Sequence, residues 1–217
     1  MADTYPLPSK MQPVQFEIDP AGQMTQQDVH PVHKFSSVDE NWAVYLSTSF
    51  ITLETSKYSD RADMLGRFKA ALSALAGVAD IPSISRVGFR YVNRISEPAD
   101  YADIEALVTP AVLGTHLIPL PDNVERQHSI TQALFVAPQG SLTTKWAFLP
   151  GSSSHDPTIE PVLLPSWILD LDAFDDTKLE FEISAVVARI QQLAALAYSF
   201  FRWSVKDEFL TRFGGMK

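Results

Sequence analysis

Apolar residues recur at spacings of three and four in two segments of the chain, which predicts two amphipathic helices. The first is expected to run from an N-cap at Ser59 to about Val78. The second is expected to begin at the capping box formed by Thr177 and Glu180 and to continue to Phe201. Each helix has one wide apolar face, so each must bury that face against a neighbouring layer of structure.

Seven other segments are rich in β-branched and aromatic residues or alternate between apolar and polar side chains, as strands do. These segments are residues 14–18, 42–47, 50–55, 85–95, 128–136, 141–149 and 167–172. Short turn sequences predict that the second and third segments form one hairpin and the fifth and sixth another. A short helix is expected at residues 103–108, and a terminal helix from a cap at Ser204 to Gly214.

The order of these elements predicts an α+β fold, with an antiparallel sheet of about six or seven strands and two long helices packed mainly on one face. Residues 1–35 differ from the remainder because they contain five of the 15 prolines and show no helical period. We expect a proline-rich, extended lead-in there. Residues 36–217 are expected to form a single α+β domain.

Composition narrows the classes of function. The 217 residues carry a net charge of −9, which disfavours binding to nucleic acid or to an anionic membrane. Because the chain contains no cysteine, thiolate catalysis, disulfides and iron–sulfur centres are excluded. It also has no Walker loop and no G-x-G-x-x-G motif, so no cofactor is expected. The start of the chain does not resemble a secretory signal, and the longest apolar window, residues 186–201, is too short to span a bilayer. A cytoplasmic protein is therefore expected.

The strand at residues 85–95 carries the clearest candidate for a binding site. Arg86, Arg90 and Arg94 share one face of this strand, and Tyr91 and Asn93 are polar neighbours near its end. A row of guanidinium groups can hold an anionic ligand through bidentate hydrogen bonds. These five residues form the candidate ligand-binding set.

The arginine row also has a structural explanation, which an acidic chain favours. Asp170 and Asp172 share one face of another predicted strand, and Glu54 lies on a third, so cross-strand ion pairs are expected to engage the arginines. The two aspartates are also of the residue type that serves acid–base chemistry or binds a divalent metal. Further acidic residues next to them indicate an acidic strand end instead. No catalytic residue is assigned.

The histidines do not form a metal-binding pattern. His30 and His33 flank Pro31, and no third ligand is near them in the sequence. The sequence Ser-His-Asp at residues 154–156 contains the residue types of a nucleophilic triad. Triads are assembled from distant segments, however, and are recognised by geometry. A flexible loop is the expected interpretation of this segment, and no metal is expected.

The C-terminal segment is rich in aromatic residues interspersed with basic ones. Phe201, Trp203, Phe209 and Phe213 are the candidate partner-interface residues, because aromatic side chains at helical spacing are typical of a core or an oligomer surface. Stacking on nucleic-acid bases uses the same residue types. The acidic residues at 207–208 make that alternative the weaker one.

Several segments together resemble a known family, and the central one reads R-x-G-x-R-Y-x-N over residues 86–93. The other segments are residues 35–37, 42–44, 50–58, 108–114, 169–172 and 197–201. They resemble a sporadically distributed family of uncharacterised bacterial proteins, over roughly residues 35–213. Family members open with an apolar strand and a helix, and residues 1–35 replace that opening here. The resemblance implies one bacterial α+β domain and no particular reaction, and a missing strand would leave a sheet edge for another chain.

Two functional hypotheses follow from these patterns. The first is a non-enzymatic, cytoplasmic interaction or regulatory domain whose partner is another protein or a second copy of the chain, as in a homodimer. The second is a protein or enzyme that binds a small anionic molecule on the face of Arg86, Arg90 and Arg94. The second hypothesis requires an open pocket and at least one of the three guanidinium groups without a carboxylate partner.

Overall fold

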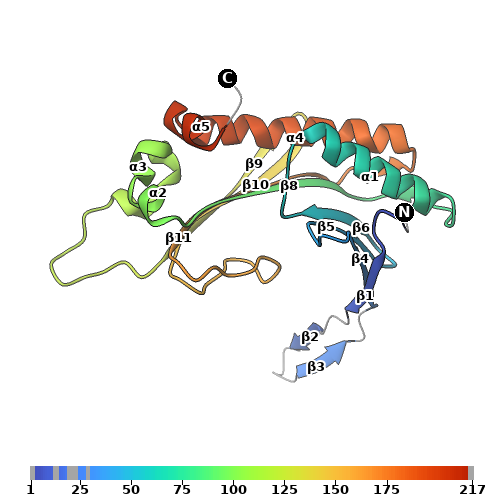
Figure 1. The fold of residues 1–217 in the computed structure, drawn as a ribbon, viewed down its shortest axis with the longest axis horizontal. Coiled ribbons are helices and arrows are strands. Elements are labelled where there is room, and N and C mark those ends of the chain that lie inside the picture. The colour runs from blue at the N-terminus through green and yellow to red at the C-terminus, as the bar shows by residue number, and fades with distance from the viewer. Residues whose placement is uncertain (1–2, 12–14, 19–23, 28–29, 215–217) are drawn as a thin grey trace. The chain divides into compact units, whose positions relative to one another are not determined.

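The computed structural model describes residues 3–11, 15–18, 24–27 and 30–214, and the chain divides into two compact units, Met1–Ile81 and Pro82–Lys217 (Figure 1). Each unit contains a four-stranded antiparallel sheet and one long helix. The predicted α+β class is therefore confirmed.

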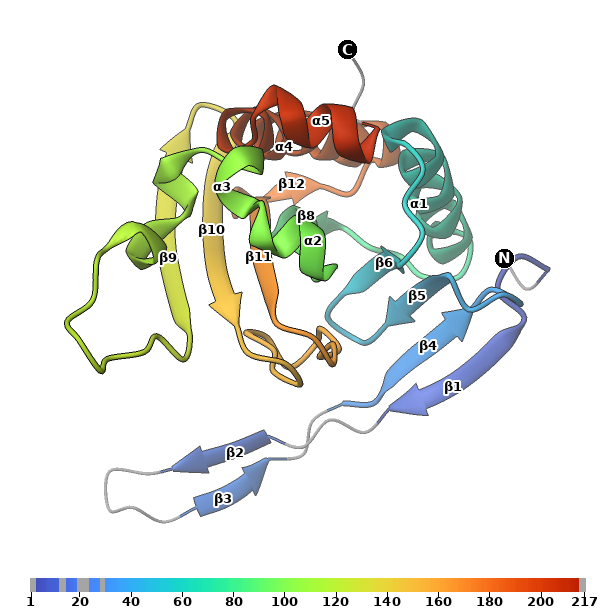
Figure 2. The same ribbon diagram turned by 60° about the vertical axis from the view of Figure 1, so that its left-hand side comes forward.

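In the first unit the four strands lie in the order β1-β4-β5-β6 (Figure 2). Their bounds are Leu7–Met11, Val32–Ser36, Trp42–Leu46 and Ile51–Thr55. β5 and β6 form the predicted hairpin, with Trp42 opposite Thr55. β2 (Gln15–Ile18) and β3 (Met24–Gln27) pair with each other as a separate two-stranded sheet. The strand expected at residues 14–18 corresponds to β2, and Val14 lies outside the described residues.

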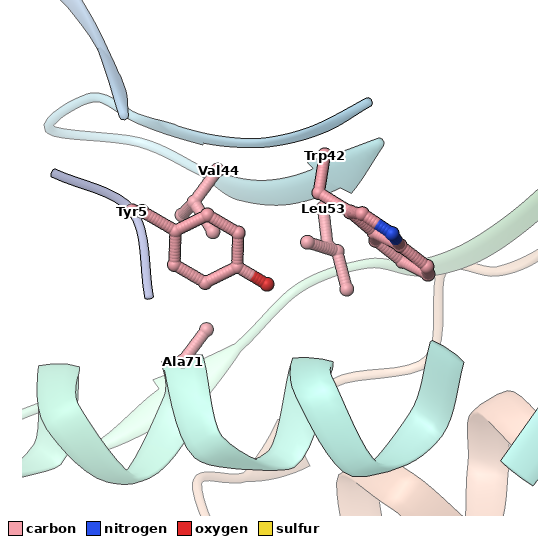
Figure 3. Close-up of a cluster of buried hydrophobic side chains, with 5 residues drawn as sticks. All are labelled: Tyr5, Trp42, Val44, Leu53 and Ala71. Atoms are coloured by element: carbon pink, nitrogen blue, oxygen red, sulfur yellow. The ribbon is translucent and has the colours of Figure 1, made fainter. Parts of the chain in front are cut away.

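The long helix of this unit, α1 (Arg61–Ala76), supplies part of the core beside the sheet (Figure 3). Tyr5, Trp42, Val44, Leu53 and Ala71 form one buried cluster. Three of these residues come from β5 and β6 and one comes from α1, as the apolar patterns predict. Tyr5 precedes β1 and is only 5% exposed. The start of the chain is therefore part of the core of this unit.

In the second unit the strands lie in the order β8-β11-β10-β9. Their bounds are β8 Val87–Ile95, β9 Ser129–Ala137, β10 Gly140–Leu149 and β11 Ser166–Asp175. The helix α4 (Ile183–Ser204) lies along one face of this sheet and contacts β8, β10 and β11 (Figures 1 and 2). Trp167, Leu169 and Leu171 of β11 are fully buried because β11 is a central strand.

Short elements complete the second unit. They are β7 Ser83–Ile84, α2 Pro98–Ala102, α3 Ile104–Leu107, the 3₁₀ helices η1 Pro110–Val112 and η2 Gly114–Leu117, β12 Leu179–Glu180, and α5 Asp207–Phe213. β12 pairs with β7, and α5 contacts α3. The left-handed backbone of Gly214, with φ +76°, ends α5 as predicted.

Three predicted helix starts are shifted in the structure. Asp60, not Ser59, caps α1, because its carboxylate accepts the amide hydrogen of Asp63 at 2.9 Å. The capping box at Thr177 is wrong: residues 179–180 form β12, and the carboxylate of Glu182 caps α4. Ser204 is the last residue of α4 and does not cap α5.

Two larger expectations are also corrected. The strands do not form a single sheet of six or seven strands but divide between two four-stranded sheets and two small ones. The chain does not divide at residue 35, because β4 crosses that position and pairs with both β1 and β5. The described part of the lead-in is thus largely sheet, and the boundary between units falls at residues 81–82.

Among the described residues, α4 is the one helix long and apolar enough to cross a membrane. Its buried residues include Val186, Ile190, Leu193 and Ala197, which lie on one face. Core helices of globular proteins have the same length and composition. Packing on the second sheet accounts for the apolar residues of this face.

Candidate functional site

The second sheet has one face covered by α4, and no helix from the described residues of this unit covers the other face. Phe135 of β9 contacts Phe200 of α4 with ring centroids 5.2 Å apart, and the strand register places Phe89 of β8 on the same face as Phe135. Because side chains alternate along a strand, Arg90 and Arg94 lie on the opposite face. The register therefore gives β8 one apolar face and one face that carries the arginines, as the sequence predicts.

Arg90 lies at the centre of a cluster of charged side chains on this second face. Its Nε donates to Oδ1 of Asp170 at 2.8 Å, and its Nη2 donates to Oδ2 of Asp170 at 2.7 Å. Nη2 also donates to Oδ2 of Asp156 at 2.7 Å. The Asp170 side chain is only 4% exposed. This bidentate, nearly buried pair is the strongest charged interaction that the predicted residues form.

His155 completes the cluster from the loop that joins β10 to β11. Its Nε2 lies 2.9 Å from Oδ2 of Asp170, and its side chain is fully buried. Its Nδ1 is also buried and has no hydrogen-bond partner among the described residues. The loop folds back through a hydrogen bond from the amide of Ser152 to the carbonyl oxygen of Val162 at 2.7 Å. It thereby places His155 and Asp156 against the arginine row.

The other two arginines have weaker partners. Arg86, just before β8, is 3.0 Å from Asp176 and 3.5 Å from Asp172, and its guanidinium lies 3.9 Å from the ring centre of Phe174. Arg94 donates from Nη1 to the carbonyl oxygen of Glu160 at 2.8 Å. Its Nε and Nη2 are buried without a hydrogen-bond partner among the described residues. Arg94 is thus the arginine of the row for which the described part of the chain provides no carboxylate partner.

The predicted pairing of the row with Asp170 and Asp172 is confirmed for Arg90 and Arg86. Glu54, the third candidate carboxylate, lies in the first unit. Burial, the negative charge of Glu54 and the hydrogen bond that the Tyr45 hydroxyl donates to it raise the pKa of Tyr45 to about 12. Residues 154–156 are a loop, as expected. The ordered contacts of His155 and Asp156 were not foreseen, because they connect segments that are distant in the sequence.

Tyr91 and Asn93 do not join the arginine row. Tyr91 contacts Phe89 edge to face at 4.7 Å, and Asn93 donates to the carbonyl oxygen of Leu169 at 3.4 Å. Both residues alternate with the arginines and lie on the face that α4 covers. The structure therefore brings together Arg86, Arg90 and Arg94 from the predicted set and separates the other two.

The pKa shifts follow from these contacts. Burial raises the pKa of Asp170, but the hydrogen bonds from Arg90 and His155 outweigh burial, so its pKa lies below the usual value. For Asp156, burial is likewise outweighed by hydrogen bonds from Thr158 and Arg90, and the pKa is strongly lowered. Burial raises the pKa of Asp172, which the arginines offset only in part. Burial lowers the pKa of Arg94.

These shifts predict that acid destabilises the second unit. Asp156 and Asp170 have lowered pKa values in the folded state, so their stabilisation is present above the unfolded-state pKa of about 4 and is lost as the pH falls through the folded-state values. The contribution of Asp172 to stability changes with pH in the opposite direction. Because its pKa is raised in the folded state, its protonation favours folding as the pH falls.

Thermal unfolding measured between about pH 5 and about pH 2 should therefore show a falling midpoint for the second unit, because its carboxylates with a lowered pKa, which also include Asp175 and Glu182, outnumber Asp172 with its raised pKa. The decrease should be smaller in Asp156→Asn. An equally steep decrease in that variant would contradict the role of Asp156.

Three of the four predicted partner-interface residues, Phe201, Phe209 and Phe213, form a connected aromatic surface on α4 and α5 together with Tyr198. Tyr198 contacts Phe201, Phe201 contacts Phe209, and Phe209 contacts Phe213, with ring centroids between 4.8 and 6.2 Å apart. Phe209 is buried, whereas Tyr198 and Phe213 are 42% and 45% exposed. Trp203, the fourth predicted residue, is 54% exposed and contacts Phe200 instead.

Two hollows on the surface of the described residues lie away from the arginine row. One hollow is lined by residues of α5, including Asp207 and Arg212, and another by Tyr5, Gly66 and Arg67 of the first unit. Within the described part of the chain, no group of three histidine or acidic side chains has the geometry to hold a metal ion.

Comparisons with protein-family models, with curated proteins and with solved structures each find no match to this chain. The family resemblance therefore stays a prediction from sequence, and function must be argued from the two surfaces described above.

Proposed function

We propose that this chain is a non-enzymatic protein-interaction domain of the bacterial cytoplasm. The observation that carries the proposal is the aromatic surface of α4 and α5. Exposed rings at Tyr198 and Phe213 are connected through Phe201 to the buried ring of Phe209, so this surface is held in place by packing. Exposed aromatic residues on a rigid base are enriched at the centres of protein interfaces.

The arrangement of the arginine row supports the same proposal. Arg90 is engaged by Asp156 and Asp170, and Arg86 by Asp172 and Asp176. An anionic ligand would have to displace these carboxylates, which already provide the bidentate geometry that it would offer. The ion pairs therefore favour a structural role for the row, in which it holds the loop between β10 and β11 against the sheet.

The proposal is tested by native mass spectrometry of the protein purified from its own host. We expect a complex with a second protein, and we expect the double variant Tyr198→Ser/Phe213→Ser to lose that protein, because it removes both exposed rings. Phe50→Ser is the matched control, since Phe50 is 46% exposed in the first unit. Purification of the wild type without a protein partner, or the same complex in the double variant, would contradict the proposal.

A second function is favoured by one observation at Arg94. Two of its buried guanidinium nitrogens have no hydrogen-bond partner among the described residues, so a small anion that displaced the loop would meet unsatisfied donors. In the same mass spectra, a bound small anion that disappears in Arg94→Gln would support this alternative over the interaction domain.

A further inference from the structure

The edges of the two four-stranded sheets differ in how they are protected. Three of the four edge strands carry proline or charge: β1 contains Pro8 and Lys10, β6 contains Glu54, and β8 contains Arg90 and Arg94. Such residues hinder the pairing of an edge with another chain. The fourth edge strand is β9, with the sequence Ser-Ile-Thr-Gln-Ala-Leu-Phe-Val-Ala and neither proline nor charge.

The 3₁₀ helix η2 contacts β9 where Gly114 lies against Thr131, but other usual forms of protection are not found among the described residues. β9 pairs with β10 without interruption from Ser129 to Ala137, so no bulge twists the edge away. Its side chains are largely exposed although they are apolar: Ile130 is 50%, Leu134 62% and Val136 82% exposed. These three share the face that α4 does not cover. A long, uncharged edge of this kind is a template for pairing with a further strand.

The sequence of β9 fits a second copy of itself. In an antiparallel pair related by a twofold axis at Ala133, all nine residues find a partner, and Ile130 of each copy lies opposite Val136 of the other. Gln132 then lies opposite Leu134, and Thr131 opposite Phe135. The pairing extends the apolar strip of the open face across both copies. It brings no like charges together at the strand, although each copy carries a net charge of −9.

The face covered by α4 adds to this edge. Phe135 of β9 is 43% exposed and contacts Phe200, which in turn contacts the exposed ring of Trp203 at 5.1 Å. The edge therefore has apolar side chains above and below the sheet. Both sets would be buried when a second sheet continues the first.

We propose that the chain forms a homodimer in which β9 pairs antiparallel with β9 of a second copy about Ala133, joining the two second-unit sheets into one continuous sheet. This inference rests on the proposed function only in that the chain binds protein. It names a second copy as the partner and a surface distinct from the rings of Tyr198 and Phe213.

Cysteine trapping tests the register directly, because the chain contains no cysteine of its own. Ala133→Cys places the two thiols opposite each other within disulfide range, and a covalent dimer should form rapidly under mild oxidation. In Gln132→Cys the equivalent residues are diagonal, and crosslinking should be at least about tenfold slower. Val92→Cys, on the opposite edge of the same sheet, should remain a monomer on a denaturing gel.

The association itself is tested by analytical ultracentrifugation of the purified chain. We expect a dimer that Leu134→Lys/Val136→Lys converts to a monomer, because the lysines place like charges along the new pair. Val92→Lys is the matched control, since Val92 is 40% exposed on the same face at the other edge. This control and Tyr198→Ser/Phe213→Ser should both remain dimers.

The outcomes separate the two proposals. A monomeric wild type, equal crosslinking at 132 and 133, or a dimer that survives the two lysines would overturn the β9 dimer. None of these results depends on whether a second protein is recovered from the host. Conversely, a dimer with the expected behaviour would support the β9 proposal even if no partner protein binds the rings of Tyr198 and Phe213.

Discussion

Replacing Arg90 by alanine is expected to lower the free energy of unfolding of the second unit by about 3–5 kcal/mol. The reason is that Asp170 would keep a charge in a site where its side chain is only 4% exposed, and His155 would be its one remaining partner in the cluster. Removing one partner of a buried pair costs more than the pair itself contributes, because the other charge stays desolvated. Urea unfolding followed by hydrogen exchange at the amides of β8 and β11 measures the change.

Two further variants define this prediction. Arg86→Ala should cost less than about 1 kcal/mol, because the Arg86 side chain is 48% exposed and its ion pairs are screened by solvent. Arg90→Ala/Asp170→Ala should be less destabilised than Arg90→Ala alone, since no uncompensated carboxylate remains. If Arg86→Ala and Arg90→Ala destabilise the unit equally, the cluster is not the structural centre of this face.

Replacing Tyr5 by alanine is expected to destabilise the first unit by about 3 kcal/mol or more, the range for a large buried aromatic residue. Tyr5 is 5% exposed and packs with Val44, Leu53 and Ala71 (Figure 3). The loss of its ring opens a cavity between the sheet and α1 that the rigid strands of the hairpin cannot fill. Hydrogen exchange at the amides of β5 during urea unfolding reports the stability of this unit.

Leu7→Ala is the control for Tyr5, because Leu7 lies two residues further on but is 42% exposed. Its effect should stay within about 0.5 kcal/mol, as is usual for surface positions. A similar small effect of Tyr5→Ala would show that the start of the chain is an extended lead-in after all, as its proline content predicts.

Much of the local structure could be predicted from the sequence. The helical period over Met64, Leu65 and Leu72 marks α1, and the alternation around Phe89 and Arg90 marks β8 and its two faces. These patterns are legible because each helix or strand buries one face, and the period of the side chains depends only on the local backbone. The hairpins β5–β6 and β9–β10 were predicted for the same reason, since their strands are joined by short turns.

The capping box at Thr177 shows where local patterns fail. Thr177 and Glu180 fit the motif, but Leu179 pairs with Ile84 of β7, a strand far away in the sequence. That pairing competes with the first helical turn, and the helix begins later, at the cap that Glu182 provides. The proline content likewise led to a wrong prediction of an extended lead-in at the start of the chain. β1 contains Pro8 and still forms a strand, because it lies at the edge of its sheet.

The candidate site was predicted in its residue types and not in its geometry. The register places Asp172 directly opposite Arg90, yet the guanidinium of Arg90 bonds the diagonal residue Asp170. That choice depends on the loop between β10 and β11, which brings His155 and Asp156 to the same carboxylate and guanidinium. The position of this loop depends on contacts between segments that are distant in the sequence. Such contacts leave no periodic pattern in the sequence from which they could be predicted.

By itself, the sequence determined the α+β class, the positions of most helices and strands, the two faces of β8 and the acidic, cysteine-free chemistry of the chain. These properties follow from side-chain periodicity and composition, which act over a few residues. Only the tertiary structure decided that the strands form two sheets, that Tyr5 belongs to a core, that Arg90 is held by Asp170, and that β9 is an edge. Each of these depends on which distant segments pair, and the energy of such pairing is a property of the assembled fold.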